Sequence, residues 1–304
     1  VSAMTRASSA YLLGALAPLF WSGTFVLGRA LHESMPPIAL SFWRWSVALL
    51  ILVPFALPRV RAQLPLLRAN LGLITLLAVL GVTNFNTFVY LGLQTTSATN
   101  AVLMQSAVPV LIVGLSAVLL RQAATPRQIA GVLLSLIGVG VIVTGGDPTT
   151  LAGVHFNTGD LWVLAAVLSW ALYSVCLRLR PDGLDPLAFL GATVALGTLP
   201  LIPLYLWELT VAGRTFALTP ENIAAIGYVA LFPSIAAYIV WNRSVAAVGP
   251  SRTGQLLHLM PVFGILLSVV LLGERVHGFQ AAGIAMIAAG ILAAAASRGR
   301  PRRG

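Results

Sequence analysis

The sequence predicts an all-α integral membrane protein in which ten transmembrane helices form two inverted five-helix repeats. Three observations support this fold: the composition, the placement of the arginines and an internal repeat. Of the 304 residues, 58% are hydrophobic and only 9% are charged, whereas roughly 25% of the residues in a soluble domain are charged. A membrane-spanning helix needs ~20 largely apolar residues, so this length suits about ten spans joined by short connections.

Glycine, proline, arginine and aspartate divide the chain into apolar stretches of that length. We expect spans at 9–30, 38–57, 70–93, 97–121 and 126–145 in the first half, and at 158–180, 185–207, 220–246, 250–272 and 277–297 in the second. These spans define a first repeat over residues 1–146, a linker loop over 147–157, a second repeat over 158–297 and a basic tail over 298–304.

The arginines predict the orientation in the membrane. The formal net charge is +10, and every basic residue is arginine because the sequence contains no lysine. If both termini are cytoplasmic, only Arg29, Arg214 and Arg275 fall in outer connections. Lysine and arginine accumulate on the cytoplasmic side of membrane proteins. We therefore expect a multi-pass protein of the bacterial inner membrane with both termini in the cytoplasm.

The same charges exclude several functions. Arginines dispersed over short loops do not form the basic face that a nucleic-acid-binding domain needs. Without lysine there is no Walker-type phosphate loop and no Schiff-base amine. We expect no cofactor and no metal, and the partners are a small-molecule substrate and the lipid bilayer. The sequence is compatible with a monomer.

An internal repeat carries the functional prediction. A shift of 152 positions superposes Pro109 on Pro261, and a shift of 149 earlier in each half superposes Trp21 on Trp170. Each repeat has five spans, an odd number, so the second repeat must insert upside down relative to the first. Secondary transporters use inverted repeats of this kind and hold substrate near the midplane, where the halves meet.

Two motifs resemble those of a known family. The stretch Leu271–Gln280 resembles the signature that closes the second half of EamA-type carriers, which belong to the drug/metabolite transporter superfamily. The segment Ser41–Arg44 resembles the aromatic-arginine pattern of that family's second span. The family's usual glutamate at the end of the fourth span is replaced by Gln122, opposite Glu274 in the second half.

The resemblance covers nearly the whole chain. It implies ten helices, cytoplasmic termini and the export of amino acids or other small organic solutes. Bacterial aromatic amino-acid exporters are similar to this chain in length and overall pattern.

Polar residues within spans are candidates for the substrate site, because polar side chains at membrane depth face cavities or one another. Asn86 and Tyr90 lie four residues apart, hence on one helix face. The repeat places Tyr238 and Asn242 on the corresponding face of the eighth span. The two pairs either line a shared central site or form hydrogen bonds between helices.

Aromatic residues are further candidates. Trp21 and Trp170 lie deep in their spans, and with Tyr173 they suit an aromatic wall for an amphiphilic solute, although packing alone is the alternative. Trp45 lies nearer a span end and is expected in the interfacial belt.

The fourth and ninth spans contribute polar residues around a central proline. Pro109 and Pro261 are predicted hinges or kinks, since proline removes a backbone donor and frees a carbonyl group. Substrate contact with that free carbonyl is the alternative. The substrate-binding candidates of these two spans are Asn100, Gln105, Gln255 and His258.

His258 and Arg44 each allow two interpretations. His258 is the one histidine well inside a span, where it acts either in proton coupling or as a neutral hydrogen-bonding residue. Arg44 either supports the structure or contacts a substrate carboxylate. Glycines in the fifth and tenth spans predict a closely packed helix pair outside the site.

We therefore expect a secondary transporter that exports small neutral or zwitterionic metabolites, foremost amino acids and among them aromatic ones, by alternating access at a central cavity. Because the acidic residues lie at span ends or in connections, facilitated transport or exchange is favoured. The alternative is an exporter of drugs or other metabolites with proton coupling. An enzyme is not expected, because an intramembrane active site needs paired catalytic groups at depth.

Overall fold

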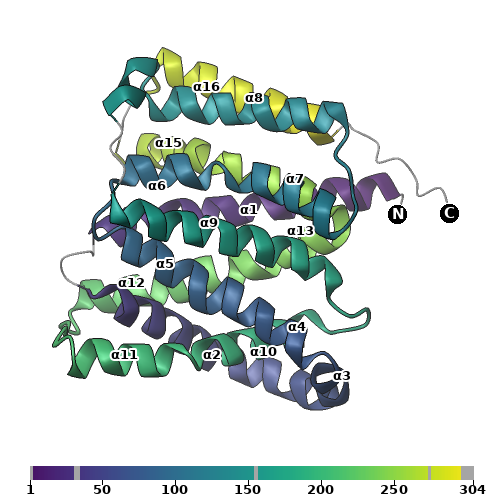
Figure 1. Ribbon diagram of the computed structural model, residues 1–304, viewed down its shortest axis with the longest axis vertical. Coiled ribbons are helices and arrows are strands. Elements are labelled where there is room, and N and C mark those ends of the chain that lie inside the picture. The colour runs from purple at the N-terminus through teal and green to yellow at the C-terminus, as the bar shows by residue number, and fades with distance from the viewer. Residues whose placement is uncertain (1–2, 31–34, 154–156, 273–274, 296–304) are drawn as a thin grey trace.

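The computed structural model describes residues 3–30, 35–153, 157–272 and 275–295 (Figure 1). The predicted basic tail over 298–304 and Glu274 of the family motif lie outside these ranges. All regular elements within them are helical.

The first half of the chain contains eight α-helices, one π-helical segment (η1) and one 3-10 helix (η2). They are α1 (Ala3–Ala30), α2 (Pro37–Ala62), α3 (Leu64–Ala69), α4 (Leu71–Ala78), η1 (Val79–Asn84), α5 (Phe85–Gly92), α6 (Ala98–Gln105), α7 (Val108–Leu119), α8 (Pro126–Val143) and η2 (Pro148–Gly153).

The second half has a similar series, with a π-helical segment (η4) and two 3-10 helices (η3 and η5). It comprises α9 (Thr158–Cys176), η3 (Leu177–Leu179), α10 (Pro186–Thr198), α11 (Leu201–Thr210), α12 (Pro220–Val229), η4 (Ala230–Ala236), α13 (Ala237–Val248), α14 (Pro250–Gly254), η5 (Gln255–His258), α15 (Leu259–Leu272) and α16 (Gly278–Ala295).

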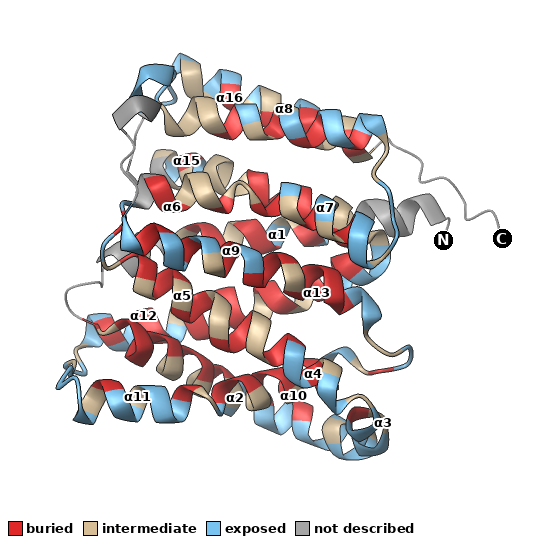
Figure 2. Cartoon of the chain, in the orientation of Figure 1, coloured by how far each residue is buried: buried red, intermediate tan, exposed pale blue. Residues whose placement is uncertain are grey.

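Eight helical stretches of the described residues are long and apolar enough to cross a membrane. They coincide with eight of the predicted spans. The other two predicted spans correspond to α1, which packs against α13 and α15, and to the broken run from α14 to α15, where α14 packs against α7. Exposed positions recur along the outermost helices (Figure 2). Large apolar side chains such as Leu50, Val118 and Val270 are among the exposed residues, as expected for helices in contact with lipid.

Polar caps fix where several helices begin. Asn157 and Asp160 form a capping box at the start of α9, in which each side chain accepts a backbone N–H of the other residue. Asp160 also accepts a hydrogen bond from the hydroxyl of Thr96 in the connection before α6. The carboxylate of Asp160 therefore links the start of α9 to the connection before α6.

Glu208 performs the same task for α2, whose first residues have no side-chain cap of their own. Its carboxylate oxygens accept the backbone N–H groups of Ile38 at 3.2 Å and Ala39 at 2.6 Å. The negative charge also suits the positive end of the helix dipole.

We expect Glu208→Ala to lower the free energy of unfolding by about 1–2 kcal/mol, because it exposes two helix-terminal donors. Glu208→Gln, which retains one acceptor oxygen, should lose less. Thermal unfolding in detergent measures the difference, with Glu221→Gln as a control at an exposed carboxylate. Equal stability of Glu208→Ala and wild type would contradict this role.

The pair of α8 and α16 is joined along a seam of small residues at one side of the bundle (Figure 1). A Cβ atom added to Gly131 would lie 2.5 Å from the carbonyl oxygen of Gly290, and one added to Gly138 would lie 2.8 Å from that of Gly283. The two backbones can approach this closely only because neither side carries a Cβ. The close packing predicted from the glycines is confirmed.

Candidate substrate-binding site

Two π-helical segments, η1 and η4, interrupt the helices at the centre of the bundle. In η1, the carbonyl group of Leu80 accepts a hydrogen bond from Ser169 at 2.9 Å, and that of Gly81 accepts one from the hydroxyl of Tyr238. Both donors come from the second half of the chain. Irregular backbone at membrane depth needs such partners, and π segments are frequent at functional sites.

The segment η4 is bound by residues of the first half. Pro233 has no N–H to donate to the carbonyl of Val229, and the hydroxyl of Ser234 donates to that carbonyl instead, at 2.7 Å. The carbonyl of Pro233 in turn accepts the indole N–H of Trp21 at 2.9 Å, and Arg44 Nε donates to Ser234 Oγ at 2.5 Å. Each π segment is therefore held by side chains from the other half of the chain.

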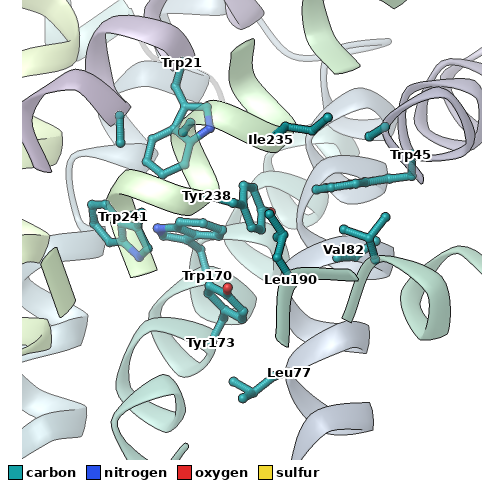
Figure 3. Packing of buried hydrophobic residues seen from close by; sticks show 14 of the residues in the cluster. Trp21, Trp45, Leu77, Val82, Trp170, Tyr173, Leu190, Ile235, Tyr238 and Trp241 are labelled. Atoms are coloured by element: carbon teal, nitrogen blue, oxygen red, sulfur yellow. The ribbon is translucent and has the colours of Figure 1, made fainter. Parts of the chain in front are cut away.

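A cluster of aromatic rings surrounds Trp170 between these segments (Figure 3). Trp21 meets it edge-on with ring centroids 5.0 Å apart, and Tyr173 stacks on it at 5.0 Å. The other rings around Trp170 are those of Phe85 at 4.7 Å, Tyr238 at 5.4 Å and Trp241 at 5.5 Å. All five of these centroid distances lie within the range at which aromatic pairs attract each other. We call these six residues the aromatic cluster.

Gly81 is needed for this packing. A Cβ atom at that position would lie 2.6 Å from the ring of Tyr173. The glycine thus lets Tyr173 lie directly against η1 while the carbonyl of the same glycine binds Tyr238.

A small cavity adjoins the aromatic cluster. It is formed where α5 follows η1, where α6 ends and where η5 replaces regular helix. The cavity volume open to the centre of a water molecule is about 20 Å³, which is room for about one water molecule. The lining residues are Trp21, Thr24, Phe85, Asn86, Val89, Gln105, Trp170, Leu257 and Met260.

Four polar atoms of these lining residues are buried and have no hydrogen-bond partner among the described residues: Thr24 Oγ1, Asn86 Nδ2, Gln105 Nε2 and Trp170 Nε1. An unpartnered buried polar group costs about 1–3 kcal/mol. Four of the eleven such atoms among the described residues thus surround one cavity, which makes it the candidate site for a bound molecule.

The cavity brings together four of the predicted binding residues, namely Trp21, Asn86, Gln105 and Trp170. Tyr173 and Tyr238 lie behind them in the aromatic cluster. The hydroxyl of Tyr173 donates to Asn242 Oδ1 at 2.9 Å, so these two side chains bond to each other.

The remaining predicted residues lie apart from the lining. The hydroxyl of Tyr90 accepts a hydrogen bond from Arg44 at 2.9 Å. Asn100 lies 3.5 Å from the carboxylate of Asp160. Gln255 donates to the backbone of α8 at the carbonyl of Gln128, at 3.3 Å.

His258 faces the other broken span. Its Nε2 atom lies 3.1 Å from the carbonyl oxygen of Ser106, which occupies the turn between α6 and α7. Pro109 and Pro261 follow this turn and η5, respectively, near the points where regular helix resumes. Proline is tolerated in the first turn of a helix, since no donor is needed there.

Sequence reasoning missed part of the site. Five lining residues carry no signal that separates them from ordinary packing residues: Thr24, Phe85, Val89, Leu257 and Met260. Trp45, expected in the interfacial belt, is instead completely buried, with its ring 5.2 Å from that of Tyr238. That prediction was wrong because distance from a span end does not reveal which face of the helix meets its neighbours.

Comparisons with known proteins agree with this architecture. The sequence profile described as the EamA-like transporter family matches residues 8–144 and again residues 157–295. A solved crystal structure superposes with a TM-score of 0.75, covering 94% of this chain and 96% of the other at 24% identity, which shows the same fold.

Relatives with similar sequences are named as transporters. An uncharacterized transporter of Archaeoglobus fulgidus is 32% identical, covering 93% of this chain and 96% of its own length. A probable amino-acid metabolite efflux pump of Salmonella typhimurium is 27% identical, covering 92% of each chain. The protein is therefore a multi-pass membrane transporter and not an enzyme, and it belongs to the EamA-like transporter family of the drug/metabolite transporter superfamily.

Proposed function

We propose that this transporter exports small neutral or zwitterionic metabolites, foremost amino acids and among them aromatic ones, from the cytoplasm. The observation that carries the proposal is the cavity, where aromatic rings adjoin four unpartnered polar atoms. Apolar walls with a few polar groups are typical of small-molecule sites. The name of the Salmonella relative supports the same substrate class.

The mechanism proposed is alternating access between two inverted five-helix repeats, over residues 1–146 and 158–297, joined by the linker 147–157. Two contacts support such a relation, because they join residues 152 positions apart: Ser106 with His258, and Ser135 with Ile287 at 3.4 Å. The same shift of 152 positions relates Gly131 to Gly283 and Gly138 to Gly290, so it exchanges the two close contacts of the glycine seam. The segments η1 and η4 also occupy corresponding positions in the two halves.

In this arrangement all ten predicted spans cross the inner membrane, and both termini are cytoplasmic. The cavity as described admits water but no amino acid. Substrate therefore enters when the two halves separate on one side, and the breaks in α6–α7 and in η5 supply the bending points. Facilitated transport or exchange fits best, because the described membrane-buried acids, Asp160 and Glu208, serve as helix caps.

The test is exchange of radiolabelled amino acids across proteoliposomes that contain the purified protein. We expect exchange without ATP and without dependence on an imposed pH gradient. If no amino acid exchanges, the exporter proposal is wrong; if exchange requires a proton gradient, the proton-coupled alternative replaces it.

Trp21→Ala should lower the exchange rate about tenfold, the effect of losing roughly 1.4 kcal/mol of interaction. The reason is that the substitution removes one wall of the cavity and the donor to Pro233. Trp207→Ala, at an exposed tryptophan of α11, is the control and should retain the wild-type rate. Equal rates for both variants would place the substrate elsewhere.

A further inference from the structure

The unpartnered atoms of the cavity are mostly hydrogen-bond donors. The amide nitrogens of Asn86 and Gln105 and the indole nitrogen of Trp170 can only donate, while the Thr24 hydroxyl can do either. Three donors without acceptors call for an acceptor group on the ligand. A carboxylate offers two oxygens with about four lone-pair sites and no donor of its own.

A buried positive charge is linked to the lining of this cavity through the residues that it binds. Arg44 is 1% exposed, and no carboxylate among the described residues pairs with it. Its guanidinium donates to Tyr90, one helical turn from Asn86, and to Ser234, whose neighbour Pro233 binds Trp21. Arg44 therefore binds neighbours of two lining residues, Asn86 and Trp21, in a buried setting where low dielectric leaves its field weakly screened.

Negative charge is absent from the described surroundings of the cavity. None of the lining residues is acidic. The carboxylates buried elsewhere in the described ranges are occupied at helix ends: Asp160 accepts from Thr96 and Asn157, and Glu208 accepts from the start of α2. A substrate ammonium group would find no counter-charge among these residues.

The predicted cytoplasmic side of the molecule has the same character. A wide hollow lies where α7 and α9 end and α8 and α14 begin. Its lining includes Arg121, Arg178 and Arg252 and no acidic residue, because Gln122 stands where the family resemblance leads one to expect glutamate. Such a basic hollow raises the local concentration of anions.

We infer that the site recognises its substrate by a carboxylate group, which the donors of Asn86, Gln105 and Trp170 bind in the field of Arg44, and that it does not recognise the ammonium group of an amino acid. The ligand class is an organic carboxylate with an apolar or aromatic body. This inference rests on the proposed site and narrows its substrate class.

The inference is tested by binding, separately from transport. Thermal stabilisation of the detergent-solubilised protein is measured with phenylalanine, with 3-phenylpropionate, which lacks the amine, and with phenethylamine, which lacks the carboxylate. We expect the two carboxylates to bind with similar affinity and the amine about tenfold or more weakly, as loss of a charged hydrogen-bonding group implies.

The outcomes separate the two proposals. Tighter binding of phenethylamine than of 3-phenylpropionate overturns the carboxylate inference, and so does binding of none of the three compounds. Binding of carboxylates without any exchange in proteoliposomes overturns the export proposal and leaves the recognition inference standing.

Gln105→Glu provides a sharper test with little change in shape. It places a negative charge in the cavity, so it should weaken 3-phenylpropionate about tenfold or more and improve phenethylamine. Gln94→Glu makes the same change after α5, outside the lining, and should leave both affinities as in wild type. If Gln105→Glu binds both compounds as the wild type does, the carboxylate lies elsewhere and the inference is wrong.

Discussion

Replacing Trp170 with alanine is expected to produce the largest loss of both stability and transport. Its ring contacts five other aromatic rings, on α1, α5, α9 and α13, and lines the cavity. In soluble cores this substitution costs about 3–5 kcal/mol. Lipid is itself apolar, so the loss here is one of packing, and we expect about 3 kcal/mol. Thermal unfolding and amino-acid exchange measure the two effects.

Trp162→Ala is the matched control for this prediction. It makes the same substitution in the same helix, at a side chain that is 43% exposed. Its unfolding temperature and exchange rate should remain close to those of the wild type. Similar losses in the two variants would show that the aromatic cluster has no special role.

Replacing Gly131 with alanine is expected to force α8 and α16 apart. The new Cβ would lie 2.5 Å from the backbone oxygen of Gly290, and neither backbone can yield locally as a flexible side chain can. Overpacking of this kind costs about 1–3 kcal/mol. Unfolding of the detergent-solubilised protein should therefore occur at a lower temperature.

Gly140→Ala in the same helix tests whether the contact or the glycine itself matters. A Cβ at Gly140 meets no atom within 4 Å, and alanine is the better helix former. This variant should match or exceed the stability of the wild type. A loss as large as that of Gly131→Ala would mean that the seam is not the cause.

The course of the helices could be predicted because the membrane imposes it. Apolar length and punctuation place a span at 126–145, and the structure has α8 at Pro126–Val143. The proline starts the helix, and glycines follow its end. The π segments could not be predicted in this way, since every residue type in η1 also occurs in the regular helices α4 and α5 around it.

The site was predictable only in part. The repeat indicated that Trp21 and Trp170 are related, and their rings do meet in the structure. The four-residue spacing placed Asn86 and Tyr90 on one face, yet only Asn86 lines the cavity, and Tyr90 binds Arg44 instead. Spacing along a helix determines which residues share a face. The choice of partner depends on the neighbouring helix, which one span's sequence does not specify.

Each π segment depends on hydrogen-bond donors from the other half of the chain. Without Tyr238 and Ser169, the carbonyls of Gly81 and Leu80 would lose their side-chain partners in a medium that offers no water. Without Trp21, the carbonyl of Pro233 would be left in the same position. We therefore expect each half to complete its backbone hydrogen bonding only when the other half is in place.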